Sequence, residues 1–238
     1  MSSYGLVRTT QLKYGNNCTL TWCNLPRKSG HRYCIFHKRK LLHRGDAEQQ
    51  QINIRDINFA RSTVKQLISD NQSNPAWAQL MEAIENNWKT ASYLVNEELN
   101  RSNDGRAYSK HRRNGLQICY DIFNTLGLEK TFINYCAWFY LSESNPNLFI
   151  SDIAFRHLLV KTLKNQAQHR SKVAINKLKG KSQIYSYPLY MHERDVVWEV
   201  MTGIFGTTGM QLYKQLERRA ERLRLNKEKI NDALRRIE

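Results

Sequence analysis

Apolar residues recur at helical spacing through most of this 238-residue chain. Between residues 46 and 72, a polar run comes first, and an apolar face then follows at intervals of three or four: Ile57, Ala60, Val64, Leu67 and Ile68. This period predicts a helix with one buried face. A second helix is predicted after Asn74, a capping residue, and Pro75, which suits a first turn. Its apolar stripe comprises Trp77, Leu80, Met81, Ile84, Trp88, Ala91 and Val95.

The middle of the chain predicts further helices separated by short breaks. A turn is expected at residues 103–105, then a helix over 106–126 that begins basic, turns apolar and ends at Gly127. The aromatic-rich segment 128–143 predicts a buried helix. Two cysteines lie in these apolar stretches and are predicted to be core residues: Cys119 and Cys136.

A break at Asn145-Pro146-Asn147 precedes Ser151, which is a suitable cap for the next helix. That helix carries Ile153, Leu158, Leu159 and Leu163. The order helix, break, helix is compatible with a helix-turn-helix, but any compact helical protein offers such pairs.

The last third of the chain combines a short extended segment with two more helices. Residues 182–191 alternate in part and are rich in tyrosine, which favours a strand or extended wing, and Pro188 would keep it at an edge. A helix is predicted over 193–205, and glycines then loosen the chain before a final helix from about 208 to 237. That helix places apolar residues every seven positions: Leu216, Leu223, Ile230 and Ile237.

The formal net charge of +16 indicates a polyanionic partner, because a strongly positive protein attracts polyanions. Net charge carries no information about the fold. The charge is concentrated in two blocks. Residues 1–45 contain nine Lys or Arg, residues 153–192 contain eight, and neither block contains Asp or Glu. A generally basic, solvated surface is the simpler alternative. A membrane surface fits less well, because Cys, Gly and Pro interrupt the N-terminal block where an amphipathic helix would be needed.

The pattern also excludes some classes of protein. No stretch approaches the roughly 18 apolar residues of a membrane-spanning helix, and the N-terminus lacks the layout of a signal peptide. We therefore expect a cytoplasmic protein of a prokaryote, or of a cell hosting a phage.

Candidate metal ligands stand in two pairs near the N-terminus: Cys18-x4-Cys23 and Cys34-x2-His37. Zinc takes four Cys or His ligands in a tetrahedron, and short loops supply them in pairs. Pro26 and Gly30 provide turn residues between the pairs. His31 and His43 could compete as ligands, but the tighter spacing from Cys34 favours His37.

Residues 18–40 resemble a family of short zinc modules of bacterial and phage proteins. Such modules combine a Cys-x4-Cys pair, a proline soon after, and a Cys-x2-His pair that ends in basic residues, and they often accompany nuclease or DNA-binding domains. The resemblance implies metal binding and a nucleic-acid context for the finger. In this chain the glycine that usually precedes the last Cys is shifted to Gly30.

Four protein ligands would close the coordination sphere, so the zinc is predicted to be structural. It would fix a loop that presents cationic side chains to DNA or RNA: Arg27, Lys28, Arg32, Lys38, Arg39 and Lys40. Three aromatic residues interleave with them and could stack on bases, although packing the small core of the finger is their more economical role: Trp22, Tyr33 and Phe36. The second basic block offers another candidate set: Lys161, Lys164, Arg170, Lys172, Lys177, Lys179 and Lys181.

Catalytic signatures are weak. An HNH-type nuclease needs a general-base His, a second His and an Asn on a ββα unit, and the nearest string, His111 to Asn114, lacks a properly spaced partner His. His157 and His169 adjoin the basic block, where phosphate contact or solvation explains them better than metal binding. The acidic and basic side chains at His192–Asp195 are typical of a helix N-terminus.

The predicted fold is mainly α: a zinc finger with a basic arm over 1–45, a helical domain over 46–207 with the basic segment 153–192, and a C-terminal helix over 208–238. A short β element is predicted near 182–191. The function indicated is zinc-dependent binding of DNA or RNA in regulation, replication or assembly, in a phage or mobile-element setting. Two alternatives stay open: a metal-dependent nuclease, and a homo-oligomeric scaffold through residues 212–237.

Overall fold

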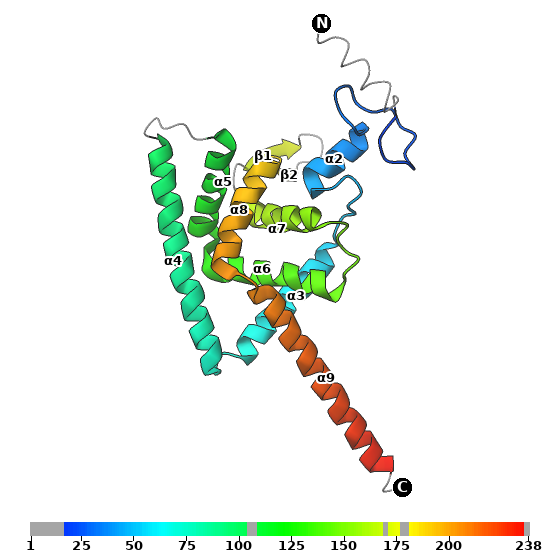
Figure 1. Cartoon of the computed structure of the whole chain (residues 1–238), viewed down its shortest axis with the longest axis vertical. Coiled ribbons are helices and arrows are strands. Elements are labelled where there is room, and N and C mark those ends of the chain that lie inside the picture. Colours follow the sequence, from blue (N-terminus) through cyan, green and yellow to red (C-terminus); the bar gives the residue numbers. More distant parts are fainter. Residues whose placement is uncertain (1–16, 104–108, 169–170, 177–180, 236–238) are drawn as a thin grey trace, which may run out of the picture.

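The protein is mainly helical, with one short β-hairpin (Figure 1). The computed structural model describes residues 17–103, 109–168, 171–176 and 181–235, and for 103, 171–176, 181–186, 223 and 230–235 it describes the backbone alone. In chain order the elements are α2 (Ile35–Arg44), α3 (Ile54–Asp70), α4 (Pro75–Asn103), α5 (Lys110–Asp121), the π-helical turn η1 (Ile122–Leu126), α6 (Gly127–Ser144), α7 (Asp152–Gln166), β1 (Ser171–Asn176), β2 (Lys181–Ser186), α8 (Met191–Phe205) and α9 (Thr208–Arg235).

The first two helices of the body follow the predicted patterns. Along α3 the apolar face is buried at Ile57, Ala60, Val64 and Leu67. The start of α4 is capped as expected, because the side chain of Asn74 accepts a hydrogen bond from the N–H of Ala76 at 3.0 Å.

The polar run after Asp46, which precedes the predicted apolar face, is not helical, and α3 begins at Ile54. Within this run Gln49 is fully buried. Its amide nitrogen donates a hydrogen bond to the carbonyl of Leu148, and its Oε1 accepts one from the N–H of Ile150. A buried amide satisfied in this way ties the linker to the loop before α7.

The predicted helix end at Gly127 is confirmed, because η1 ends at Leu126 and Gly127 is its C-cap, with a non-helical φ of 76° and ψ of 172°. After α5 the chain passes through η1 directly into α6, and Gly127 begins α6 at a φ of 76°. Ile122 and Phe123 are buried, and Phe123 packs edge-on against Trp88 on α4. The positive φ of Gly127, which glycine adopts readily, lets the chain change direction between η1 and α6.

Helix α6 is the centre of the core, as its aromatic-rich sequence predicted. Phe132, Tyr135 and Trp138 are almost wholly buried, and the hydroxyl of Tyr135 donates to the carbonyl of Gly206 at 2.9 Å. The predicted core cysteines are confirmed: Cys119 and Cys136 are buried, and burial raises the pKa of both thiols.

The predicted break after α6 and the cap at Ser151 are confirmed, because the Ser151 hydroxyl accepts from the N–H of Ala154 at 3.2 Å. The β element is also present but is a hairpin. Strand β2 pairs antiparallel with β1, from Ser171 opposite Ser186 to Asn176 opposite Lys181. Residues 187–190 are not a strand, and α8 begins at Met191.

Helix α9 packs on α6 through its first turns and then extends away from the body (Figure 1). Gly209 lies against Phe139, Leu212 is buried, and Arg219 Nη1 pairs with Asp70 Oδ2 at 2.6 Å at the end of α3. Leu216 is partly buried on the same core, whereas the side chains of Leu223 and Ile230, and all of Ile237, lie outside the described part. None of the helices described here combines the length and apolar character needed to cross a bilayer.

Candidate metal centre and its surroundings

The first ligand pair lies on a tight loop closed by backbone hydrogen bonds. The N–H of Cys23 donates to the carbonyl of Leu20, and the N–H of Cys18 donates to the carbonyl of Leu25, each at 2.9 Å. An isolated bridge joins Asn17 to Pro26. This folding of the chain turns two cysteine side chains toward one point and buries them.

The second pair lies at the start of α2. Cys34 is the N-cap residue, and His37 is the third residue of the helix, so both side chains lie on one face of its first turn. The loop that leads into α2 turns at Gly30, whose φ of 72° is left-handed. Gly30 therefore supplies the predicted turn conformation from its shifted position.

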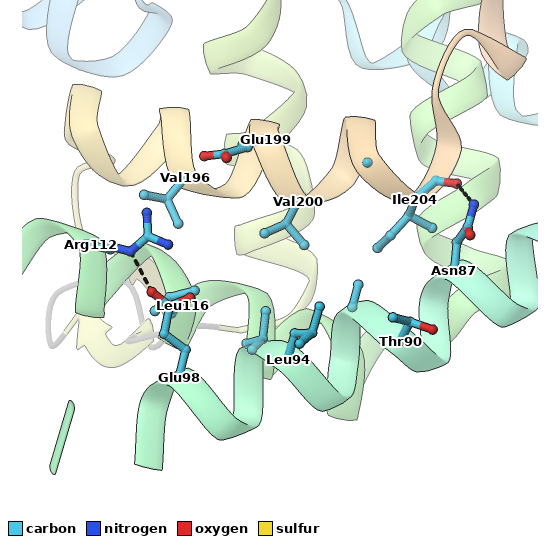
Figure 2. A pocket seen from close by; sticks show the side chains of 13 residues that line it. Asn87, Thr90, Leu94, Glu98, Arg112, Leu116, Val196, Glu199, Val200 and Ile204 are labelled. Atoms are coloured by element: carbon cyan, nitrogen blue, oxygen red, sulfur yellow. Dashed lines mark hydrogen bonds and ion pairs between the residues drawn. The ribbon is translucent and has the colours of Figure 1, made fainter. Parts of the chain in front are cut away.

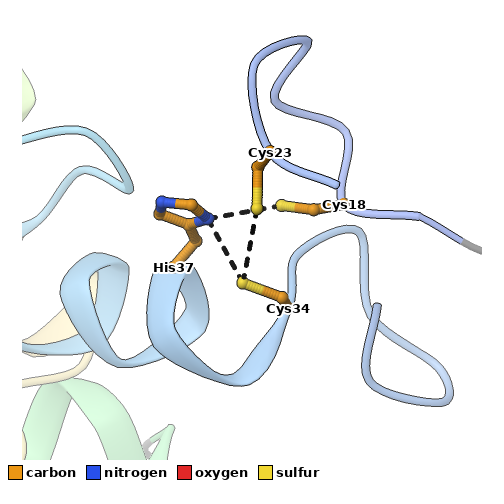
Figure 3. A group of neighbouring side chains, drawn as sticks. All are labelled: Cys18, Cys23, Cys34 and His37. Atoms are coloured by element: carbon orange, nitrogen blue, oxygen red, sulfur yellow. Dashed lines mark hydrogen bonds between the residues drawn. The ribbon is translucent and has the colours of Figure 1, made fainter. Parts of the chain in front are cut away.

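Cys18, Cys23, Cys34 and His37 converge, with their ligand atoms within 4.8 Å of one another (Figure 3). Nδ1 of His37 lies 3.4 Å from Sγ of Cys18 and 3.2 Å from Sγ of Cys34, and the sulfurs of Cys23 and Cys34 are 4.0 Å apart. In a tetrahedron with typical zinc bond lengths, such atoms would be about 3.5 to 3.8 Å apart. All four side chains are buried, so the group can hold a metal ion and leaves little room for a bound water.

The electrostatics of the cluster suit a cation. Burial raises the pKa of the Cys18 thiol, but hydrogen bonds from the backbone at Cys34 and Leu20 outweigh it and leave that pKa below its ordinary value. A backbone hydrogen bond at Leu25 lowers the pKa of Cys23, but burial and the adjacent Cys18 and Cys34 leave it raised. Several buried thiolates repel one another, and a divalent ion between them removes that repulsion.

The competing histidines lie outside this cluster, so the preference for His37 is confirmed. His31 is exposed, and its Nε2 accepts a hydrogen bond from Nζ of Lys38. His43 is exposed near the end of α2, where burial and the cations Lys161, Arg39 and Arg44 lower its pKa.

The aromatic residues of the finger divide into two groups. Tyr33 is partly buried against the cysteines, as expected for a small core. Trp22 and Phe36 are 60% and 58% exposed, so their assignment to that core is wrong. Trp22 packs edge-on against the ring of His37, with centroids 4.8 Å apart, and its Nε1 donates to Glu48 at 2.9 Å.

The cationic side chains predicted to face nucleic acid lie on the loop and helix that carry the Cys3His cluster. Lys28, Arg32 and Arg39 are exposed, and the other three are partly exposed: Arg27, Lys38 and Lys40. Residues 17–45 contain no acidic side chain. The cluster thus fixes a loop and a helix whose charged groups are all positive.

Two lysines of the second predicted basic set, Lys161 and Lys164, are engaged in hydrogen bonds within the fold. Lys164 is 2% exposed and its Nζ donates to the carbonyl of Tyr187, so it cannot face a polyanion in this fold. Lys161 donates to the carbonyl of His43 at 2.7 Å, where it satisfies the end of α2. The remaining members lie outside the described residues or side chains: Arg170, Lys172, Lys177, Lys179 and Lys181.

His157 corrects the expectation of a solvated histidine, because it is only 3% exposed. It lies beneath the C-cap of α2, where a Cβ added to Gly45 would come within 2.5 Å of the Cβ of His157. Burial lowers the pKa of His157 to about 4, and the nearby cations Lys161 and Arg194 add to that effect. The sequence of α7 indicated this burial, because Ala154 and Val160, three positions away on either side of His157, are apolar. It could not indicate the contact with Gly45. His169 lies outside the described residues.

The string from His111 to Asn114 is positioned beside the start of α8. The ring centroids of His111 and His192 are 5.5 Å apart, and Asn114 Nδ2 donates to Oε1 of the buried Glu193 at 2.9 Å. Glu193 also accepts from the N–H of Tyr190, which makes it a helix-capping residue. Within the described part of the chain, no group of three or more metal-ligating side chains occurs besides the finger cluster.

Among the hollows in the described part of the chain, two lie between several elements of the fold and have a volume suited to a small ligand. The first is a trough of about 450 Å³ between α4, α5 and α8 (Figure 2). Its walls are largely aliphatic, an Arg112–Glu98 ion pair lies at one end, and Glu199 adds negative charge. The second, of about 580 Å³, lies between the finger and the body.

Comparison with known proteins adds no relative. A scan of family models, a search of curated proteins and a search of solved structures each found no match.

Proposed function

We propose that this protein binds nucleic acid through an N-terminal finger organised by one structural zinc ion. One observation carries the proposal: a buried Cys3His cluster fixes a loop and a helix that present only positive charge. Three thiolates and an imidazole favour zinc among the common divalent ions. The closed coordination gives the metal a structural role rather than a catalytic one.

Nucleic acid is the polyanion that fits this surface best. Each Lys or Arg that neutralises a phosphate releases condensed counterions, so affinity should fall steeply with salt. The finger also exposes Trp22 and Phe36 among its cations, which is the combination that stacks on bases while contacting the backbone. Arg39 and Lys28, both exposed, are the central contacts we propose.

A charge-reversal experiment tests the proposal. The Lys28→Glu, Arg39→Glu double variant should bind DNA and RNA at least about tenfold more weakly at low salt, with a shallower dependence on salt. The matched control reverses two exposed lysines on other elements, Lys65→Glu on α3 and Lys214→Glu on α9, with the same change of net charge. Equal losses in the two variants would show that only overall charge matters and would refute a site on the finger.

A further inference from the structure

The hollow between the finger and the body, which we call the junction groove, joins two parts of the chain far apart in sequence. Residues 30–46 form one wall, with Leu41 and Leu42 on α2. The opposite wall comes from α7 and from the chain around the start of α8, with Ile153, Leu189 and Met191. The volume of about 580 Å³ lies in the range typical of sites for small ligands.

Its apolar side chains are unusually open to solvent for such large residues. Leu41 is 41% exposed, Ile153 is 51% exposed and Met191 is 56% exposed. Tyr190, 52% exposed, adds an aromatic ring to the same wall. A contiguous exposed apolar surface that is hollowed in this way is typical of a binding site.

The charges that border the groove are mostly positive. Arg32 and Lys38 stand on the finger side, and both belong to the surface proposed to contact phosphates. Arg194 lies on the body side, paired with Asp195. The one acidic residue of the lining, Asp46, is engaged within the fold, because its carboxylate accepts from the N–H of Glu48 and from the hydroxyl of Ser151.

His157 belongs to the lining and adds a polar group to it. The residue is 3% exposed, and its Nε2 has no hydrogen-bond partner among the described residues. Buried polar atoms are nearly always satisfied, so an unpartnered one beside a hollow is consistent with a ligand that carries hydrogen-bonding groups. An apolar slot with a polar lining group and a cationic border fits a flat heterocycle attached to a phosphate.

We infer that the junction groove receives the base of an unpaired nucleotide, so that the protein prefers single-stranded to double-stranded nucleic acid. The inference rests on the proposed function and specifies its ligand. In a duplex the bases are stacked and paired, and a base can enter a slot only after it leaves the stack. The trough between α4 and α8 is a weaker candidate, since its charged lining residues include Glu98 and Glu199.

The test uses the zinc-loaded full chain and three probes: a labelled 15-mer of thymidine, the same strand with abasic sugars, and a 15-base-pair duplex. The variant is Leu41→Gln, Ile153→Gln, which removes apolar surface at exposed positions without changing charge. The control is Ile54→Gln, Leu225→Gln, at exposed positions on α3 and α9.

The wild-type protein should bind the thymidine strand roughly tenfold more tightly than the abasic strand, as expected for one stacked base. The groove variant should lose that advantage and leave abasic and duplex binding within about twofold of wild type. The control should behave as wild type. Equal binding of both single strands by the wild type, or an unaltered preference in the groove variant, would overturn the inference while leaving the proposed function standing. A wild-type protein that binds none of the three probes would overturn both.

Discussion

Gly45, the C-cap residue of α2, packs directly against α7, so a substitution there tests the contact between the finger and the body. Its φ of 79° is left-handed, and it packs against α7 so closely that an added Cβ would lie 2.5 Å from the Cβ of His157 and 3.0 Å from the carbonyl oxygen of Ile153. Replacement by alanine therefore carries two costs. The left-handed conformation costs about 1 to 2 kcal/mol for an L-residue, and overpacking costs about 1 to 3 kcal/mol.

The matched control is Gly30→Ala in the same finger. Gly30 has a nearly identical φ of 72°, but a Cβ there meets no atom within 4 Å. Gly45→Ala should therefore lower the free energy of unfolding by about 2 to 5 kcal/mol, and Gly30→Ala by only about 1 to 2 kcal/mol. The difference isolates the packing of α2 on α7.

Urea unfolding of the zinc-loaded variants, followed by circular dichroism, measures the global loss of stability. If the finger separates from the body without global unfolding, the strain will appear instead as faster tryptic cleavage after Arg44, whose guanidinium is held by the carbonyl of Gln49. Equal stability of the two variants together with equal cleavage rates would refute the close contact with His157.

Three further predictions concern the body of the protein. The pKa of His157 in the folded state, about 4, lies below its unfolded value, so the unfolded state binds more protons. The free energy of unfolding should therefore fall by up to about 3 kcal/mol as the pH drops from about 6.5 to 4. Unfolding titrations should show a steeper fall for the wild type than for His157→Gln, and parallel curves would contradict the burial of His157. Trp138→Ala should lower the free energy of unfolding by about 3 to 5 kcal/mol. Trp138→Phe should lower it by no more than about 1 to 2 kcal/mol, because the buried Nε1 has no hydrogen-bond partner among the described residues. Similar losses for the two variants in urea unfolding would show that Nε1 is engaged. Gly209→Ala should destabilise the fold by about 1 to 3 kcal/mol, because the added Cβ would lie 2.7 Å from the Cβ of Phe139. Gly203→Ala should stabilise it by about 0.5 to 1 kcal/mol through helix propensity, because there is open space around that position. Equal shifts of the melting temperature in the two variants would contradict this packing.

Local patterns predicted much of the fold. Helical periodicity identified the buried faces of α3 and α4, and capping residues located two helix starts, because both signals depend on neighbours within one turn. The π-turn before Gly127 and the buried Gln49 were missed, since each is decided by tertiary partners. The polarity of Gln49 suggests solvent, and only its hydrogen bonds to the loop before α7 make burial possible.

The convergence of the Cys3His side chains was predicted because ligand spacing in a short loop is itself a geometric constraint. The sequence did not show which lysines of the basic segment 153–192 face solvent. Charge alone could not distinguish Lys164, which is buried and donates to the carbonyl of Tyr187, from lysines that face solvent. The contact between His157 and Gly45 could not be predicted either, because the two residues are far apart in the sequence.

Metal content and nucleic-acid affinity, both measured on one sample, decide whether a bound zinc ion organises the nucleic-acid-binding finger. Elemental analysis of the purified chain should find one zinc per molecule, and His37→Ala together with Cys34→Ser should reduce both zinc content and affinity for a labelled oligonucleotide. Full-strength binding by a metal-free protein would contradict the account, because the positive loop would then need no ion to hold it in place.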